Sequence, residues 1–175
     1  TETPVRLKPF NLYYHNYSGE RAASLSAVTD MLALARSSQL APIHASTFAA
    51  IVDGFDSARL IIEAPDTWRI EDRGALQTIR FDDASFRAVD FQRSRGVIGQ
   101  RHHQGSLYVA LDGAVAAPVI AITAAPRTDI PPPATIAYLE QSRWRIEGVA
   151  ADAGGATFTA RGFGTGAMTW IVPKA

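Results

Sequence analysis

The chain has 175 residues, of which 47% are hydrophobic, enough for the core of a domain of ordinary size. Lysine plus arginine and aspartate plus glutamate balance at 17 each, without blocks of like charge, which argues against a nucleic-acid partner. There are no cysteines, so disulfides and thiolate metal sites are excluded. No apolar run reaches the length of a membrane span. The sequence opens Thr-Glu-Thr-Pro, without an initiator methionine, and we expect further residues upstream.

The first 56 residues have the pattern of two strand-helix units. Residues 9–15 (PFNLYYH) and 41–46 (APIHAS) are short and apolar, as expected of buried strands. Apolar residues recur at helical spacing over 21–39, with Ser18 as the expected N-cap. Ser46 is expected to cap a second helix that ends at Gly54.

Strand, helix, strand, helix is the repeat of an α/β barrel or of a doubly wound sheet. Two parallel strands cannot cover both faces of a sheet, because parallel sheets are buried on both sides and need several such units. We therefore expect residues 1–56 to be the closing β/α units of a larger barrel.

From residue 57 onward the pattern changes to short alternating runs separated by glycine, Asp-Gly and proline turns. The runs are RLIIEA, TWRIED, LQTIRF, SFRAVDFQ, GVIGQRHH, SLYVALDG, APVIAITA, ATIAYLE, SRWRIEGVA, ATFTARG and AMTWIV. About ten short strands over about 120 residues predict an antiparallel β-sandwich of jelly-roll or immunoglobulin-like kind. A proline-rich stretch, 129–135 (DIPPPAT), is expected to be an extended connection. The predicted fold class is α+β, mostly β.

Two histidines follow the expected parallel strands. His15 ends LYYH, where α/β barrels place catalytic side chains, and imidazole is the usual proton donor or acceptor near neutral pH. His44 follows the second expected strand and has no evident partner. For each of them a strand-end histidine without a function is the alternative.

Three other features admit a functional interpretation and a structural one. His102 and His103 are adjacent on an expected strand and so point to opposite faces, which does not suit one metal ion. Gln100, Arg101 and His102, with Tyr108 or a tryptophan, could instead form a sugar-binding surface. The three tryptophans, all in expected strands, are more simply core residues, and GFGTGAM (162–168) is a glycine-rich turn and not a phosphate loop.

The stretch from FNLYYHNYSGERAASLS to PIHASTFAAIVDGF resembles the end of the polysaccharide deacetylase barrel in PelA-like exopolysaccharide deacetylases of Pel biofilm systems. The resemblance covers residues 1–56 and rests on the Tyr-Tyr-His strand end, the Tyr-Ser turn and the Pro-Ile-x-x-Ser strand. In that family a β-rich domain follows at the C-terminus, as it is expected to do here over residues 57–175.

The resemblance implies that His15 is the general acid that protonates the leaving amine when an N-acetyl group is removed from a hexosamine. Tyr14, Asn16, Tyr17 and His44 are the candidate substrate contacts. In that family an aspartate usually follows the histidine, and here Asn16 stands in its place. The family's divalent, zinc-like metal is held by an aspartate and two histidines, and its base is an aspartate, all from earlier strands with no match in this chain.

The implied parent enzyme is a bacterial periplasmic deacetylase of an exopolysaccharide, and this chain by itself is expected to be inactive. Its implied partners are the polysaccharide, the upstream domains of the same protein and an outer-membrane secretion-complex protein. Two alternatives stay open. The β-sandwich could be a non-enzymatic carbohydrate-binding or scaffolding module, or it could only cap the exposed edge of the barrel.

Overall fold

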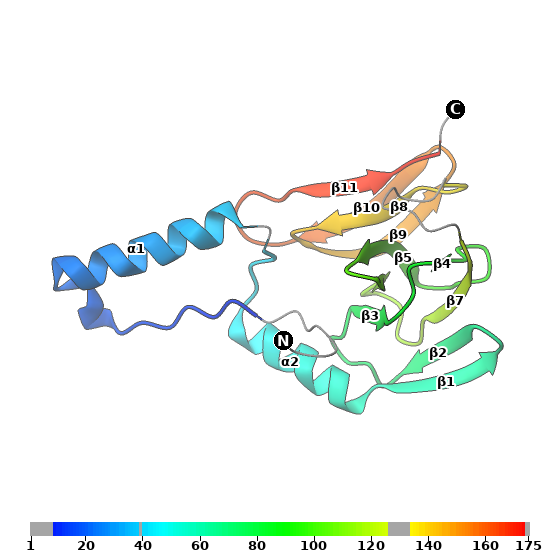
Figure 1. Cartoon of the computed structure of the whole chain (residues 1–175), viewed down its shortest axis with the longest axis horizontal. Helices are drawn as coiled ribbons and strands as arrows, with labels where there is room; N and C mark the ends of the chain where they lie inside the picture. The colour runs from blue at the N-terminus through cyan, green and yellow to red at the C-terminus, as the bar shows by residue number, and fades with distance from the viewer. Residues whose placement is uncertain (1–8, 39, 126–133, 174–175) are drawn as a thin grey trace. The chain divides into compact units, whose positions relative to one another are not determined.

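The structure is a computed structural model, and it describes residues 9–38, 40–125 and 134–173 (Figure 1). The chain forms two compact units, Thr1–Ala41 and Pro42–Ala175. The expected boundary after residue 56 refers to the parent barrel and stays a prediction. Most of the proline-rich connection at 129–135 lies outside the described residues. In the described ranges, no helix is both long enough and apolar enough to cross a membrane.

The smaller unit contains a short 3-10 helix, η1 (Asn16–Gly19), and the helix α1 (Ala22–Ser37). The helix was expected, but its N-cap is Arg21 and not Ser18. Residues 9–15 form no strand, so that expectation is wrong for this chain by itself. A strand needs a hydrogen-bonded neighbour, and no described strand pairs with this segment.

The larger unit begins with the helix α2 (Ala45–Ser57). The second expected strand is also wrong, because residues 40–44 are irregular and the helix already starts at Ala45. Its N-cap is His44 instead of Ser46, and it continues past Gly54. Gly54 lies against the backbone of Arg73 and Gly74, where a Cβ would overlap the Arg73 carbonyl oxygen. This glycine therefore allows α2 to pack closely on the β2–β3 loop.

All eleven expected strands are present. They are β1 (Arg59–Ala64), β2 (Thr67–Glu71), β3 (Thr78–Phe81), β4 (Arg87–Val89), β5 (Val97–His103), β6 (Ser106–Leu111), β7 (Val119–Ala124), β8 (Tyr138–Ser142), β9 (Arg145–Asp152), β10 (Gly155–Arg161) and β11 (Met168–Ile171). The fold is α+β, mostly β, as the alternating runs predicted.

The strands form three sheets with the orders β1-β2-β7-β4, β11-β8-β5-β6-β3 and β10-β9. Strand pairs are antiparallel except β5 and β8, which run parallel and meet at Gly99 and Leu139. Three pairs of strands that are consecutive in the chain, β1–β2, β5–β6 and β9–β10, form antiparallel hairpins with two-residue connections. Figure 1 shows the β1–β2 hairpin at one end of the strand-rich unit.

Two apolar clusters hold the sheets together. The first joins Ile70 and Ile120 of the four-stranded sheet to Leu107, Val109 and Leu111, which alternate along β6 of the five-stranded sheet. The second joins the five-stranded sheet to the β9–β10 hairpin; its members include Ile98, Leu139, Ile146, Phe158 and Trp170. The five-stranded sheet thus contributes to both clusters, a packing compatible with the expected sandwich.

Candidate functional site

The strongest candidate from the sequence, His15, lies directly before η1 in the smaller unit. Its backbone carbonyl accepts a hydrogen bond of 2.9 Å from the N–H of Ser18, which closes the 3-10 turn. Its imidazole stacks on the ring of Tyr17, with centroids 4.8 Å apart and planes 10° apart. The ring of Tyr13 meets it edge-on at 5.2 Å. The turn therefore brings two tyrosine rings against one imidazole.

This aromatic turn is open to solvent. Tyr13 is 77% exposed and Tyr17 is 62% exposed, and His15, Tyr14 and Asn16 are exposed as well. Within the described residues the side chain of His15 contacts two tyrosine rings, and its ring nitrogens have no hydrogen-bond partner there. Ring stacking occupies the faces of an imidazole and leaves its in-plane nitrogens accessible for proton transfer.

His44 occupies a different environment. It precedes α2 in the larger unit and meets the ring of Phe163 edge-on, with centroids 4.6 Å apart. Its side chain makes no capping hydrogen bond to the helix. His44 thus packs helix α2 against the glycine-rich turn at 162–166, a structural contact that the sequence did not suggest.

The described residues hold no group of three or more His, Cys, Asp and Glu side chains arranged for a metal ion. His102 contacts the carbonyl oxygen of Arg87 through Nε2 at 2.7 Å. His103, the next residue on β5, lies 6.4 Å from the ring of Tyr108. The two imidazoles have separate surroundings, as adjacent residues on a strand should.

The hypothesis of a sugar-binding surface around Gln100 is wrong for that residue, which is only 4% exposed. Its side-chain oxygen accepts a hydrogen bond of 2.7 Å from the N–H of Val89, and its amide also hydrogen-bonds the hydroxyl of Tyr138. Burial is the main cause that raises the pKa of Tyr138 to about 12. The Gln100 side chain therefore links β4 to β8 inside the protein.

The three tryptophans are all partly buried. Trp68 packs against the first apolar cluster and lies 5.1 Å from the ring of Phe81, while Trp170 stacks on Phe158 at 4.8 Å. The indole N–H of Trp144 donates to the carbonyl of Phe163 at 3.3 Å. A Cβ at Gly162 or Gly166 would overlap this indole ring. The glycine-rich turn is thus shaped to receive a tryptophan.

A buried polar cluster around Arg73 and Asp112 was not predicted from the sequence. Each residue is 4% exposed. The guanidinium of Arg73 donates to the carbonyl oxygens of Leu76, Asp112 and Val115. Burial lowers the pKa of Arg73, nearby Arg145 lowers it further, and Asp112 acts in the opposite direction. Because the guanidinium is enclosed by carbonyls, the cluster is a structural one that fixes three loops.

Comparisons of this chain with protein-family models, with curated proteins and with solved structures found no match. Among the sequence-derived candidates, His15 and Tyr17 are brought into contact, Tyr14 and Asn16 lie in the same exposed turn, and His44 belongs to the larger unit.

Proposed function

We propose that this chain is the C-terminal portion of a metal-dependent polysaccharide N-deacetylase, periplasmic in a bacterium, that acts on an N-acetylhexosamine-containing exopolysaccharide. Residues 1–56 would complete the deacetylase barrel, and the β-rich part would form a jelly-roll-like sandwich beside it. The substrate polymer, the upstream domains and an outer-membrane secretion-complex protein are the proposed partners. The observation that carries the proposal is the exposed imidazole of His15, held between two tyrosine rings with its nitrogens open.

In this proposal His15 gives a proton to the departing amine nitrogen as the acetyl group leaves. A positioned imidazole suits that role because its ordinary pKa lies close to neutral pH. Tyr17 orients the ring by stacking, and the neighbouring Tyr14 and Asn16 offer a hydroxyl and an amide to sugar hydroxyls. The described residues contain no group of side chains arranged to bind the metal ion. In this proposal the metal ligands and the catalytic base belong to the upstream part of the protein.

Uncovered apolar side chains on both helices support a larger domain around residues 1–56. None of the residues of α1 is buried, and Leu25 and Leu34 are 51% and 48% exposed. On α2, Phe55 is 69% exposed and Gly54 is the buried residue. An amphipathic helix of a barrel covers its apolar face by packing on strands, whereas these apolar side chains are exposed.

The test is replacement of His15 by alanine in the full-length protein, with acetate release from an N-acetylhexosamine oligomer as the readout. We expect at least about a hundredfold loss of rate, because general acid catalysis by a side chain contributes that much. His103→Ala removes another exposed imidazole and is the matched control, which should retain activity. Undiminished acetate release by the His15 variant would remove this residue from the mechanism. Polymer binding without any acetate release by the parent would favour a non-enzymatic carbohydrate-binding module.

A further inference from the structure

Among the described strands, β1 is an edge strand with one unpaired side. It stands at the end of the order β1-β2-β7-β4, and no other described strand pairs with it. An unpaired edge presents free backbone N–H and C=O groups, which are a template for adding another strand. The chemistry of the side chains along β1 decides what that strand can be.

One face of β1 is apolar but uncovered. Leu60 and Ile62 lie opposite Ile70 and Trp68 of β2, whose side chains enter the first apolar cluster. Cross-strand partners share a face of the sheet, so Leu60 and Ile62 point toward the core side. They are nevertheless 52% and 75% exposed, because the core ends before it reaches the edge strand. This row of apolar side chains extends past the core at the free edge.

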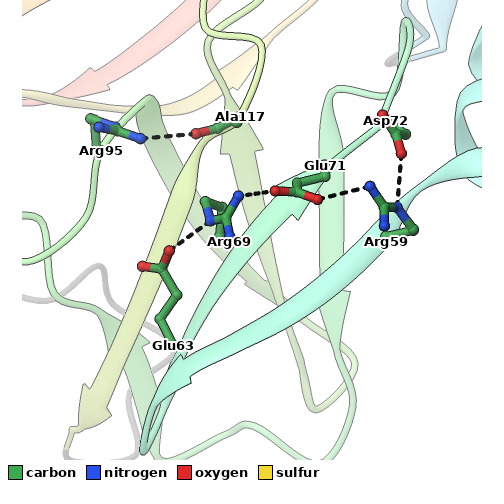
Figure 2. A network of polar contacts seen from close by, with 7 residues as sticks. All are labelled: Arg59, Glu63, Arg69, Glu71, Asp72, Arg95 and Ala117. Atoms are coloured by element: carbon green, nitrogen blue, oxygen red, sulfur yellow. Dashed lines mark hydrogen bonds and ion pairs between the residues drawn. The ribbon is translucent and has the colours of Figure 1, made fainter.

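The opposite face of the β1–β2 hairpin carries charges of alternating sign. Figure 2 shows the connected side chains, in the order Glu63, Arg69, Glu71, Arg59 and Asp72. Arg69 contacts Glu63 at 2.7 Å, and Arg59 contacts Glu71 at 2.9 Å. On β1 itself this leaves a cation at position 59, the aliphatic Ile61 in the centre and an anion at position 63.

We propose that β1 pairs with β1 of a second copy of this chain, antiparallel and centred on Ile61, so that two four-stranded sheets join through their edges. In this register Arg59 lies opposite Glu63 of the second copy, and Glu63 lies opposite its Arg59. On the other face Leu60 lies opposite Ile62 of the second copy. Both the charges and the apolar side chains thus match themselves under a two-fold axis.

The same register satisfies the backbone. Residues opposite one another have numbers that sum to 122, so they have the same parity along the regular part of β1, from Arg59 to Ile62, which ends at a register shift between Ile62 and Ala64. The residues of β1 that point their backbone N–H and C=O groups away from β2 therefore lie opposite residues of the second copy that do the same, and the two can exchange hydrogen bonds. Opposite charges at 59 and 63 favour this antiparallel register over a parallel one, which would place Arg59 opposite Arg59 and Glu63 opposite Glu63.

The short overlap indicates that the contact is modest in strength. Five residues from each copy overlap, which is a short contact compared with a standard protein interface. We expect a weak dimer whose population rises with concentration. The inference does not depend on the proposed enzymatic function.

Charge reversal tests the register through sedimentation of the 175-residue chain over a range of concentrations. Glu63→Arg puts like charges opposite each other, and so does Arg59→Glu, so each variant should dimerise at least about tenfold more weakly than the parent. An equimolar mixture of the two variants restores both opposite-charge pairs and should form a one-to-one dimer. Arg161→Glu, an exposed reversal on β10, is the control and should behave as the parent.

A parent that stays monomeric at all concentrations would overturn the proposal, and so would a parent dimer unaffected by both reversals. Failure of the mixture to dimerise would overturn the register. Circular dichroism establishes that each variant is folded before its association is measured.

A cysteine cross-link tests the two-fold axis independently of the charges, because the chain has no cysteine of its own. Ile61→Cys should place two thiols in directly opposite positions, within the separation of Cα atoms that a disulfide can span. Mild oxidation should then give a covalent dimer. Glu63→Cys moves the thiol two residues off the axis, where the Cα atoms are too far apart, and should cross-link much less. Equal yields from the two variants would contradict a contact centred on Ile61.

Discussion

The carboxylate of Asp112, next to the end of β6, accepts a hydrogen bond of 2.8 Å from the backbone N–H of Gly148 in β9. The same carboxylate accepts from the N–H groups of Val149 at 2.9 Å and Ala114 at 2.8 Å. A buried carboxylate with three backbone donors is a charge-assisted anchor between the five-stranded sheet and the β9–β10 hairpin. It joins parts of the chain that are distant in sequence.

Asp112→Asn is expected to lower the free energy of unfolding by about 2 to 4 kcal/mol, measured by urea denaturation. The amide offers one acceptor in place of two and turns an N–H donor toward a backbone N–H donor. Asp152→Asn is the control, because Asp152 accepts two backbone N–H bonds in an exposed turn. The control should cost less than about 1 kcal/mol. Similar losses in both variants would contradict an anchoring role for Asp112.

Alkaline pH is expected to destabilise the protein through Tyr138. Burial raises the pKa of Tyr138 to about 12 from an unfolded value of 10.0. Below pH 10 the Tyr138 hydroxyl is protonated in both the folded and the unfolded state, and its contribution to the free energy of unfolding is complete. This contribution is lost as the pH rises from about 10 to about 12, because in that range only the unfolded state ionises. The loss amounts to about 2 to 3 kcal/mol.

Tyr138→Phe should therefore unfold with a shallower dependence on pH between about 10 and 12, measured by denaturation at a series of pH values. Tyr17→Phe, which removes an exposed hydroxyl, is the control and should keep the slope of the parent. An unchanged alkaline slope in the Tyr138 variant would show that other groups cause the pH dependence.

Gly99→Ala is expected to lower the free energy of unfolding by about 2 to 4 kcal/mol. A Cβ at Gly99 would overlap the backbone carbonyl of Leu139, where the parallel strands β5 and β8 meet. Gly19→Ala is the control, because nothing lies near its Cβ position. That change should alter stability by less than about 0.5 kcal/mol. Chemical denaturation of both variants checks this, and equal midpoints would mean that β8 can shift away at little cost.

Phe55→Ser is expected to leave the stability of this chain within about 0.5 kcal/mol of the parent while raising its solubility, because Phe55 is 69% exposed. Leu107→Ala, at a position with 0% exposure, should cost about 2 to 5 kcal/mol. Thermal and chemical unfolding separate the two cases. A large loss of stability for Phe55→Ser would show that this side chain is covered within the chain.

Some of the candidate site was accessible to sequence reasoning. The exposed aromatic turn around His15 follows local rules, because Tyr13, His15 and Tyr17 are neighbours in the chain and a single 3-10 turn brings the rings of His15 and Tyr17 together. The burial of Gln100 and the anchor at Asp112 were not accessible. Val89 and Tyr138, the partners of Gln100, and Gly148 and Val149, the distant partners of Asp112, lie between 11 and 38 residues away, and no local pattern specifies such pairs.

The sequence by itself determined the β-strands, because period-two alternation and turn residues act locally: Leu107, Val109 and Leu111 had to share one face of β6 wherever that strand was placed. It also determined α1 through apolar spacing. Only the tertiary structure decided that residues 9–15 and 40–44 are not strands, since a strand exists only where another chain segment completes its hydrogen bonds. It decided the free edge of β1 for the same reason: backbone pairing is a property of two segments, and one segment cannot specify its neighbour.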